Sequence, residues 1–330
     1  MPVPSLLDIK LRQDPDGKIA RRIIEQLSQT DGMLDDMTAE ECNDGSGHLT
    51  TIRTGLPAAT WRQLYQGVQP TKSTTAQVRD ACGMLEARSE IDMKALSQSG
   101  DPMAFRESEE QPFRQSLKNN VMSTLLYGNA GTEPSKFTGI AARFNTSISA
   151  NAATADNVIK AGGASTDNTS IYVHTWGPQF GTMLYPKGSN LGLMARDLGE
   201  QDSFDASGNR FRAMHTQYGW DCGYSLRDWR GVVRICNIAN STLTKTGATG
   251  ADLVDLIVQA LELLPEEATA LGRIGIYCNR TVRSFLRRQI NNKSNYWIQE
   301  GMIAGKKVVT FDGLPLRRCD SISNAEALVP

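Results

Sequence analysis

The polar stretch from residue 52 to residue 92 constrains the fold more than any other part of the chain. It reads IRTGLPAATWRQLYQGVQPTKSTTAQVRDACGMLEARSEID. Its many threonines favour extended backbone, while Pro57, Gly67 and Pro70 mark turns. It has no continuous apolar face of its own, and an isolated two-stranded ribbon is marginally stable in water. We therefore expect an extended ribbon that packs on another body, most simply a second copy of the same chain, so assembly is the first function to test.

Length, composition and charge bound the class of protein. With 330 residues, the chain can hold two or more domains, or one domain with a large excursion. A composition of 40% hydrophobic and 22% charged residues is typical of a folded protein rather than a disordered one. The formal net charge of −1 provides no long-range attraction for nucleic acid, although it does not exclude local basic faces.

Cysteine spacing and the N-terminal sequence indicate the cellular compartment. The six cysteines are scattered without a CxxC pair, which argues against a zinc ribbon or a disulfide scaffold and favours buried thiols in a reducing compartment. The first residues, MPVPSLLDIKLRQDPDGK, lack the apolar core of a signal peptide. No apolar run approaches the ~18 residues of a membrane span. We expect a soluble protein made in the cytosol, with no membrane association.

Residues 1–47 have the features of an N-terminal arm. Glycines and prolines surround one short amphipathic helix, whose apolar stripe is Ile19, Ile23, Ile24 and Leu27. A single helix of this size cannot form a core, so the arm must also pack on something else. Beyond the polar ribbon, residues 84–96 look partly helical.

A long helix is predicted over residues 102–127. Asp101 is an N-cap acceptor and Pro102 suits the first helical position. Apolar residues then recur at helical spacing from Phe113 to Leu125, and Gly128 supplies the stop. A continuous helix of this length would extend about 39 Å, which suits a strut.

The second half of the chain predicts a sheet followed by a mixed layer. Short aromatic and β-branched runs fill residues 171–238 and predict a mainly antiparallel sheet, packed against the long helix, with a hairpin tip at residues 205–208. The remaining segments predict an α/β layer. They are a helix at 251–264, a strand at 273–278, a helix capped by Asn279, and two strands, 306–311 and 314–319, around the Asp312-Gly313 turn.

No common catalytic or nucleotide-binding motif is present. The sequence contains no GxSxG, GxxxxGK[ST], HExxH, or GxGxxG opening a helix. Of its three histidines, His174 and His215 could meet Asp221 or Cys222 on the sheet and form a metal or nucleophile site. The alternative, which we favour, is that both histidines are satisfied within the sheet. We therefore expect no catalytic, metal or cofactor site, and we keep a hydrolase-like enzyme using His174, His215 and Asp221 as the alternative.

Two sets of residues suggest binding rather than catalysis. The predicted helix after Asn279 carries a basic face of Arg280, Arg283, Arg287 and Arg288. This face could contact phosphates in a DNA-binding module, pair with acidic residues of a neighbouring subunit, or simply be solvated. In the polar ribbon, Trp61 and Arg62 are large amphipathic side chains of the kind enriched at protein interfaces.

The order of these segments and seven stretches of sequence resemble one known family. The predicted arm, polar ribbon, long helix, sheet and α/β layer follow one another as in the major capsid proteins of tailed bacteriophages, which have the Hong Kong 97-like fold. Segments similar to those of podovirus- and siphovirus-type capsid proteins are residues 56–92, 136–145, 167–177, 185–193, 221–238, 276–289 and 306–320. Each segment is short, but together they span nearly the whole chain in order.

The resemblance implies an α+β fold with five parts. They are an N-terminal arm at 1–47, an extended loop at 48–100, a peripheral domain at 101–240 with spine helix 102–127 and a β-sheet, an axial domain at 241–319, and a C-terminal segment at 320–330. The extended loop would lie over an adjacent subunit, with contacts through Trp61, Arg62, Tyr65 and Lys72. Some relatives cross-link a lysine covalently, but no motif around Lys72 supports a cross-link here.

The resemblance also implies the partners. The subunits would assemble, in the cytoplasm of a bacterial host, into pentamers and hexamers of an icosahedral virion head enclosing double-stranded DNA. Scaffolding, portal and cement proteins would be further partners, packaged DNA would be contacted non-specifically, and neither a cofactor nor a membrane would be involved.

Overall fold

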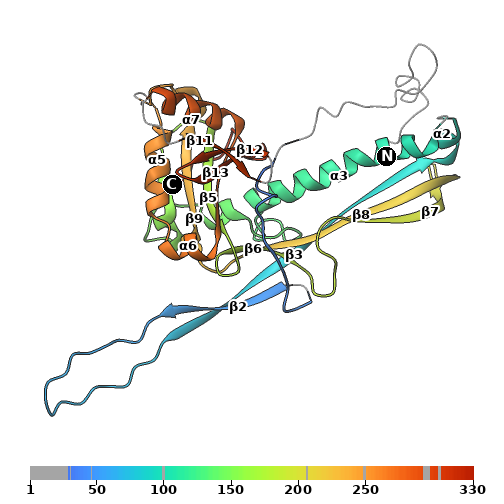
Figure 1. The fold of residues 1–330 in the computed structure, drawn as a ribbon. Coiled ribbons are helices and arrows are strands. Elements are labelled where there is room, and N and C mark those ends of the chain that lie inside the picture. Colours follow the sequence, from blue (N-terminus) through green and yellow to red (C-terminus); the bar gives the residue numbers. More distant parts are fainter. Residues whose placement is uncertain are drawn as a thin grey trace.

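One network of strands organises the molecule. We obtained a computed structural model that describes residues 29, 31–45, 47–98, 101–205, 207–247, 250–292, 298–303 and 306–330. Within these ranges a 13-stranded sheet follows the order β11-β12-β13-β10-β5-β6-β8-β3-β2, with β1, β4, β7 and β9 off this path. Figure 1 shows a body of helices and strands at one end, a long helix that leans away from it, and a hairpin that projects in another direction.

The projecting hairpin is built from β2 (Gly47–Gly55) and β3 (Thr74–Asp92). The first part of β3 pairs antiparallel with β2, from Thr74 to Ala81. From Cys82 onward, β3 instead pairs antiparallel with β8 inside the main sheet. Only the part of the predicted ribbon before residue 82 therefore projects from the molecule.

The prediction of partial helix over residues 84–96 is wrong for most of its length. β3 continues to Asp92, and the short helix α2 covers Met93–Gln98. Ser89 and Ile91 are buried on β3, since pairing with β8 turns alternate residues towards the interior. This tertiary pairing overrides the local helical preference of the segment.

The long helix α3 spans Pro102–Tyr127, which confirms the predicted range. Asp101 Oδ1 accepts a hydrogen bond from the backbone N–H of Ala104 at 3.2 Å. Pro112 lies inside the helix without ending it. At the other end, the N–H of Gly128 donates to the carbonyl of Thr124, and a Cβ at residue 128 would lie 2.4 Å from the carbonyl oxygen of Phe137. Glycine is thus required at the stop by the close approach of backbone.

The predicted sheet is present and mainly antiparallel. It contains β5 (Asn168–Trp176), β6 (Gly181–Tyr185), β8 (Arg210–Leu226) and β9 (Val232–Ala239). The short strand β4 (Val158–Lys160) pairs parallel with β9, and the helix α4 (Ile140–Arg143) precedes it. Strand β7 (Met194–Phe204), which the sequence did not predict, pairs antiparallel with β8. The predicted hairpin tip connects the two strands, and there the N–H of Asp205 donates to the carbonyl of Asn209.

The mixed layer after residue 250 follows the prediction with two differences. Its elements are α5 (Leu253–Glu262), α6 (Glu266–Leu271), β10 (Arg273–Cys278), α7 (Arg280–Asn292), β11 (Ile298–Ile303), β12 (Lys306–Phe311) and β13 (Leu314–Arg318). The differences are α6 and β11, which were not predicted. Asn279 caps α7 by accepting from Val282 N–H at 2.8 Å, as predicted. Asp312 and Gly313 have φ of 50° and 76°, typical of a tight hairpin turn.

Two apolar clusters lie on opposite faces of β5. Ile171 and Val173 face a cluster formed with α5 and α7, whereas Tyr172 and Trp176 face a cluster formed with α3. Every residue of β5 is buried, as expected for a strand covered on both faces. The sheet thus joins the long helix and the mixed layer into one body.

Residues 31–42 also pack on this body. Strand β1 (Ala39–Glu41) pairs parallel with β6, and Met33 is fully buried. Asp36, 1% exposed, accepts from Arg317 and from the Tyr277 hydroxyl. The predicted amphipathic helix of the arm, Ile19 to Leu27, lies outside the described residues.

Candidate assembly surfaces

The loop between β2 and β3 forms the tip of the projecting hairpin (Figure 1). Several of its large apolar side chains are exposed. Trp61 and Tyr65 are about 100% exposed, and Leu56 and Leu64 are more than 80% exposed. Arg62 and Lys72 are exposed beside them. The hydrogen bonds that the structure shows here lie within the loop, for example from Thr71 Oγ1 to Ala58 O at 3.0 Å. All four predicted contact residues therefore lie on one exposed loop.

The sequence reasoning missed three apolar members of this surface. Leu56, Leu64 and Val68 are exposed together with Trp61 and Tyr65. Single exposed apolar residues are common, but a set of five on one segment is a candidate interaction site. The signal was available, because these five residues occur within thirteen positions of a stretch that has no core to bury them. We call Leu56, Trp61, Leu64, Tyr65 and Val68 the hairpin patch.

The basic face of α7 is formed as predicted. Arg280, Arg287 and Arg288 are exposed and Arg283 is half-buried. Among the described residues, none of the four has a carboxylate within ion-pair distance. Arg280 and Arg283 lie in the first turn, where a positive charge opposes the helix dipole. Arg280 and Arg283 therefore do not stabilise their own helix through its dipole, whereas the Arg288 guanidinium lies 5.2 Å from the centre of the Phe285 ring on the same helix.

The structure does not bring the candidate catalytic residues together. His174 on β5 is buried against Trp176 and lies 2.7 Å from the Tyr224 hydroxyl on β8. Burial lowers the pKa of His174 to about 3, so this imidazole is neutral at ordinary pH. His215 lies nine residues from Tyr224 along the same strand, roughly 30 Å away at 3.3 Å per residue. The alternative of an enzyme using His174, His215 and Asp221 is wrong.

His215 has a separate local environment. Its Nε2 lies 2.8 Å from Ser203 Oγ, and its Nδ1 lies 3.8 Å from a carboxylate oxygen of Glu90. Ser203 is only 5% exposed, so the hydroxyl cannot reach a substrate carbonyl. In the described ranges, no three His, Cys, Asp or Glu side chains gather in a way that could hold a metal ion, and no helix is both long and apolar enough to cross a membrane.

Comparison with known proteins assigns the chain to a family. A family model described as major capsid protein GP7 matches residues 14–330. The chain belongs to the major capsid protein GP7 family. A chain from a near-atomic structure of bacteriophage Epsilon15 is 37% identical to this capsid protein, with a TM-score of 0.76, over 100% of this chain and 98% of that one. No curated protein sequence matched.

More distant solved structures share only low identity with this capsid protein. The capsid of bacteriophage JBD30 is 10% identical, with a TM-score of 0.47 over 90% of this chain and 93% of that one. The capsid of a native GTA particle is also 10% identical, with a TM-score of 0.46 over 68% of this chain and 94% of that one. Similarities at this level add no argument.

The family membership confirms the expected function and the α+β class of the fold. The protein is a major capsid protein of a tailed-phage head, a structural component of the virion and not an enzyme. Its mixed α+β fold is of the Hong Kong 97-like class. A capsid protein assembles with copies of itself into a shell, so exposed surfaces such as the hairpin patch and the basic face of α7 become candidate contacts between subunits.

Proposed function

We propose that residues 48–100 contain the extended loop by which one capsid subunit lies over the next, with contacts through Trp61, Arg62, Tyr65 and Lys72. The observation that carries this proposal is the hairpin patch, five large apolar side chains exposed on a hairpin with no core of its own. Burying one such side chain contributes ~1.5–3 kcal/mol. Because each subunit in a closed shell is held by several neighbours, modest contacts of this kind reinforce one another.

The pairing of β3 supports a narrower definition of the loop. β3 leaves β2 at Ala81 and joins β8 at Cys82. We therefore propose that the part of the loop that reaches a neighbour ends at residue 81, while residues 82–98 anchor it to the sheet and to α3.

The remaining segments receive the following roles in the proposal. Residues 1–47 are the N-terminal arm, 101–240 the peripheral domain with α3 as spine helix, 241–319 the axial domain, and 320–330 the C-terminal segment. The two apolar clusters support separate peripheral and axial parts. Because β5 contributes side chains to both clusters, the two proposed parts share a strand and do not have fully separate cores.

We further propose that the axial parts form pentamers and hexamers in which the basic face of α7 meets acidic residues of the next subunit. Glu262 at the end of α5 and Glu266 at the start of α6 are exposed. Figure 1 shows α6 and α7 at opposite ends of the same body. A ring requires such a head-to-tail arrangement, in which unlike surfaces of successive copies meet. Complementary charge would also fix the register of the contact.

A charge-reversal pair tests this ring contact. Arg287→Glu and Glu266→Arg should each reduce the yield of capsomers, and the double variant should restore it if the two side chains meet across subunits. A second outcome distinguishes a contact with DNA from a contact between subunits. If Arg287→Glu leaves shells intact but lowers the amount of packaged DNA, the basic face binds phosphates instead. If neither property changes in any variant, the face is merely solvated.

Two variants test the loop contact. Deletion of residues 56–70 should leave a folded subunit, because these residues lie outside both clusters, but it should block stable shells. The triple variant Trp61→Ala, Leu64→Ala, Tyr65→Ala should act in the same direction. Met103→Ala is the control, since Met103 is 83% exposed on α3 but lies outside the hairpin patch. Size-exclusion chromatography and negative-stain microscopy give the readout, and an unfolded deletion variant or shells at the wild-type yield would contradict the proposal.

We also propose that scaffolding, portal and cement proteins are partners of the assembled head, which encloses double-stranded DNA by non-specific contact. The observation that supports a non-specific mode is the net charge of −1, which leaves only local basic faces for phosphate contact. Co-purification of heads from infected cells, followed by mass spectrometry, identifies these partners.

A further inference from the structure

Two cysteines lie side by side at the root of the projecting hairpin. The sulfur atoms of Cys42 and Cys82 are 3.3 Å apart, although forty residues separate them in sequence. Both thiols are free. A disulfide bond joins its sulfurs at ~2.05 Å, so an approach of roughly 1 Å would bring these two into bonding distance.

The backbone holds each cysteine in place from a different direction. Cys42 follows β1 directly, and its N–H donates to the carbonyl of Tyr185 at the end of β6. Cys82 is the first residue of β3 to pair with β8, opposite Gly223. A Cβ at residue 223 would lie 3.0 Å from the sulfur of Cys82, so the glycine leaves room for this thiol. The two thiols therefore meet where the hairpin leaves the sheet.

We propose that Cys42 and Cys82 form a disulfide bond within the subunit when the particle leaves the reducing cytosol. The two S–H bonds are lost and one S–S bond forms, which releases two protons and two electrons. Dissolved oxygen can accept them and become hydrogen peroxide, or a small disulfide such as oxidised glutathione can accept them and become two thiols. This chemistry does not depend on what the hairpin contacts.

The bond would act on the hairpin as a whole. It closes a covalent loop from residue 42 to residue 82, which contains all of β2 and the exposed loop beyond it. Cross-linking a long loop reduces the conformational freedom of the unfolded chain. In the folded subunit, the bond would also fix the end of β1 to β3. The hairpin would thus be assembled in a reduced, adjustable state and then fixed at its root.

Burial sets the rate of this oxidation. Desolvation raises the pKa of both thiols above the ordinary value of 9.0. The thiolate is the reactive species, so the bond should form slowly at neutral pH and faster as the pH rises. Cys222, Cys236, Cys278 and Cys319 are also buried, and among the described residues Cys42 and Cys82 are the one pair of cysteines whose sulfurs are in hydrogen-bond contact.

The test uses full-length protein, assembled under reducing conditions and then exposed to oxidised glutathione. Titration of denatured protein should show the loss of two of its six free thiols, and the intact mass should fall by that of two hydrogen atoms. Peptide mapping should join the Cys42 peptide to the Cys82 peptide. Cys42→Ser and Cys82→Ser should abolish this change, while Cys236→Ser should keep it. Hydrogen exchange of residues 47–55 and 74–81 should slow severalfold after oxidation of the wild-type protein.

Wild-type protein alone decides the outcome, whether or not the serine variants fold. Six alkylatable thiols after oxidation, a cross-link between a different pair, or unchanged exchange of the hairpin would each overturn the proposal. Shells that assemble normally in reductant but never acquire the bond would overturn it and leave the assembly role of the loop untouched.

Discussion

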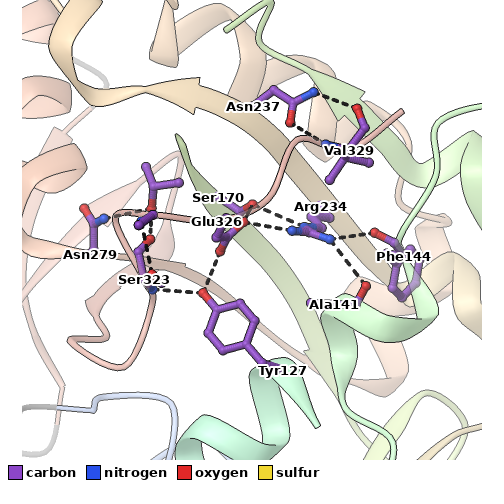
Figure 2. A network of polar contacts seen from close by, with 12 residues as sticks. Tyr127, Ala141, Phe144, Ser170, Arg234, Asn237, Asn279, Ser323, Glu326 and Val329 are labelled. Atoms are coloured by element: carbon purple, nitrogen blue, oxygen red, sulfur yellow. Dashed lines mark hydrogen bonds and ion pairs between the residues drawn. The ribbon is translucent and has the colours of Figure 1, made fainter. Parts of the chain in front are cut away.

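Arg234 on β9 and Glu326 near the C-terminus form a buried ion pair. Arg234 Nη2 lies 2.8 Å from Glu326 Oε2, and each side chain is only 5% exposed. Arg234 also donates to the carbonyl of Phe144 at 2.8 Å, and Glu326 accepts from the Tyr127 hydroxyl at 2.6 Å (Figure 2). The pair is therefore the centre of a network that joins the C-terminal segment to the end of α3 and to the sheet.

The same segment is held at further points. The side chain of Asn237 both donates to the carbonyl of Val329 and accepts from its N–H, at 2.9 and 3.0 Å (Figure 2). Ser323 N–H donates to the Tyr127 hydroxyl at 2.9 Å. Residues 323–329 thus lie across the sheet as a strap, and they contribute to the folded body rather than to a free tail.

Arg234→Ala should destabilise the subunit by about 3–5 kcal/mol, because it leaves the Glu326 carboxylate buried without its charge partner. The free energy of unfolding from urea titration of unassembled subunits measures this. Arg230→Ala is the matched control, since its ion pair with Asp228 is half-exposed and should be worth at most about 1 kcal/mol. Equal losses in the two variants would show that the Arg234 network does not hold the C-terminal strap.

Acid should weaken the attachment of α3 to the sheet through Glu110. Burial alone would raise the pKa of Glu110, but hydrogen bonds from Arg106 and Thr216 hold it below its ordinary value of 4.5. A lowered folded-state pKa gives stability that is present above pH 4.5 and is lost as the pH falls through the folded value. Glu110→Gln should therefore be less stable at pH 7 and show a flatter dependence below pH 4.5.

Urea midpoints measured between pH 7 and pH 3 check this dependence. Glu107→Gln on the exposed side of the same helix is the control and should follow the wild-type curve. If the urea midpoint of Glu110→Gln fell between pH 4.5 and pH 3 as steeply as that of the wild-type protein, other carboxylates would be responsible for the pH dependence.

Leu125→Ala should cost about 2–5 kcal/mol, because Leu125 is fully buried between α3 and the sheet and its truncation leaves a cavity. Met103→Ala, on the exposed side of the same helix, should change the free energy of unfolding by less than about 0.5 kcal/mol. Thermal and urea unfolding of the two variants give the comparison. Similar small losses in both would contradict the packing of α3 on β5, β6, β8 and β9.

Local signals in the sequence predicted the starts of the two capped helices, α3 and α7. Asp101 and Pro102 define the start of α3, and Asn279 defines the start of α7, because capping depends on residues within one turn. The Asp312-Gly313 turn was predictable for the same reason. These caps and this turn depend on residues only a few positions apart, so the local sequence is enough to predict them.

Strand pairing was harder to predict. β7 is mostly exposed and polar, so its sequence lacks the alternation that marks a half-buried strand. Residues 84–92 belong to a strand because β8, more than 120 residues later in the chain, pairs with them. A partner so distant leaves no signal in the local sequence.

The candidate contact surface was only partly visible in the sequence. The polar character of the ribbon and the presence of Trp61 predicted an exposed, interface-forming loop, and the structure shows all four named side chains exposed. The roles of Trp61, Arg62, Tyr65 and Lys72 as contacts remain predictions. Leu56, Leu64 and Val68 were overlooked because each alone resembles an ordinary core residue.

A cryo-EM reconstruction of the assembled shell tests the central claim most directly. We predict density in which the five side chains of the hairpin patch are buried against an adjacent subunit, with Trp61 and Tyr65 in contact with side chains of that neighbour. A shell in which these residues project into solvent, or fold back onto their own subunit, would contradict the account.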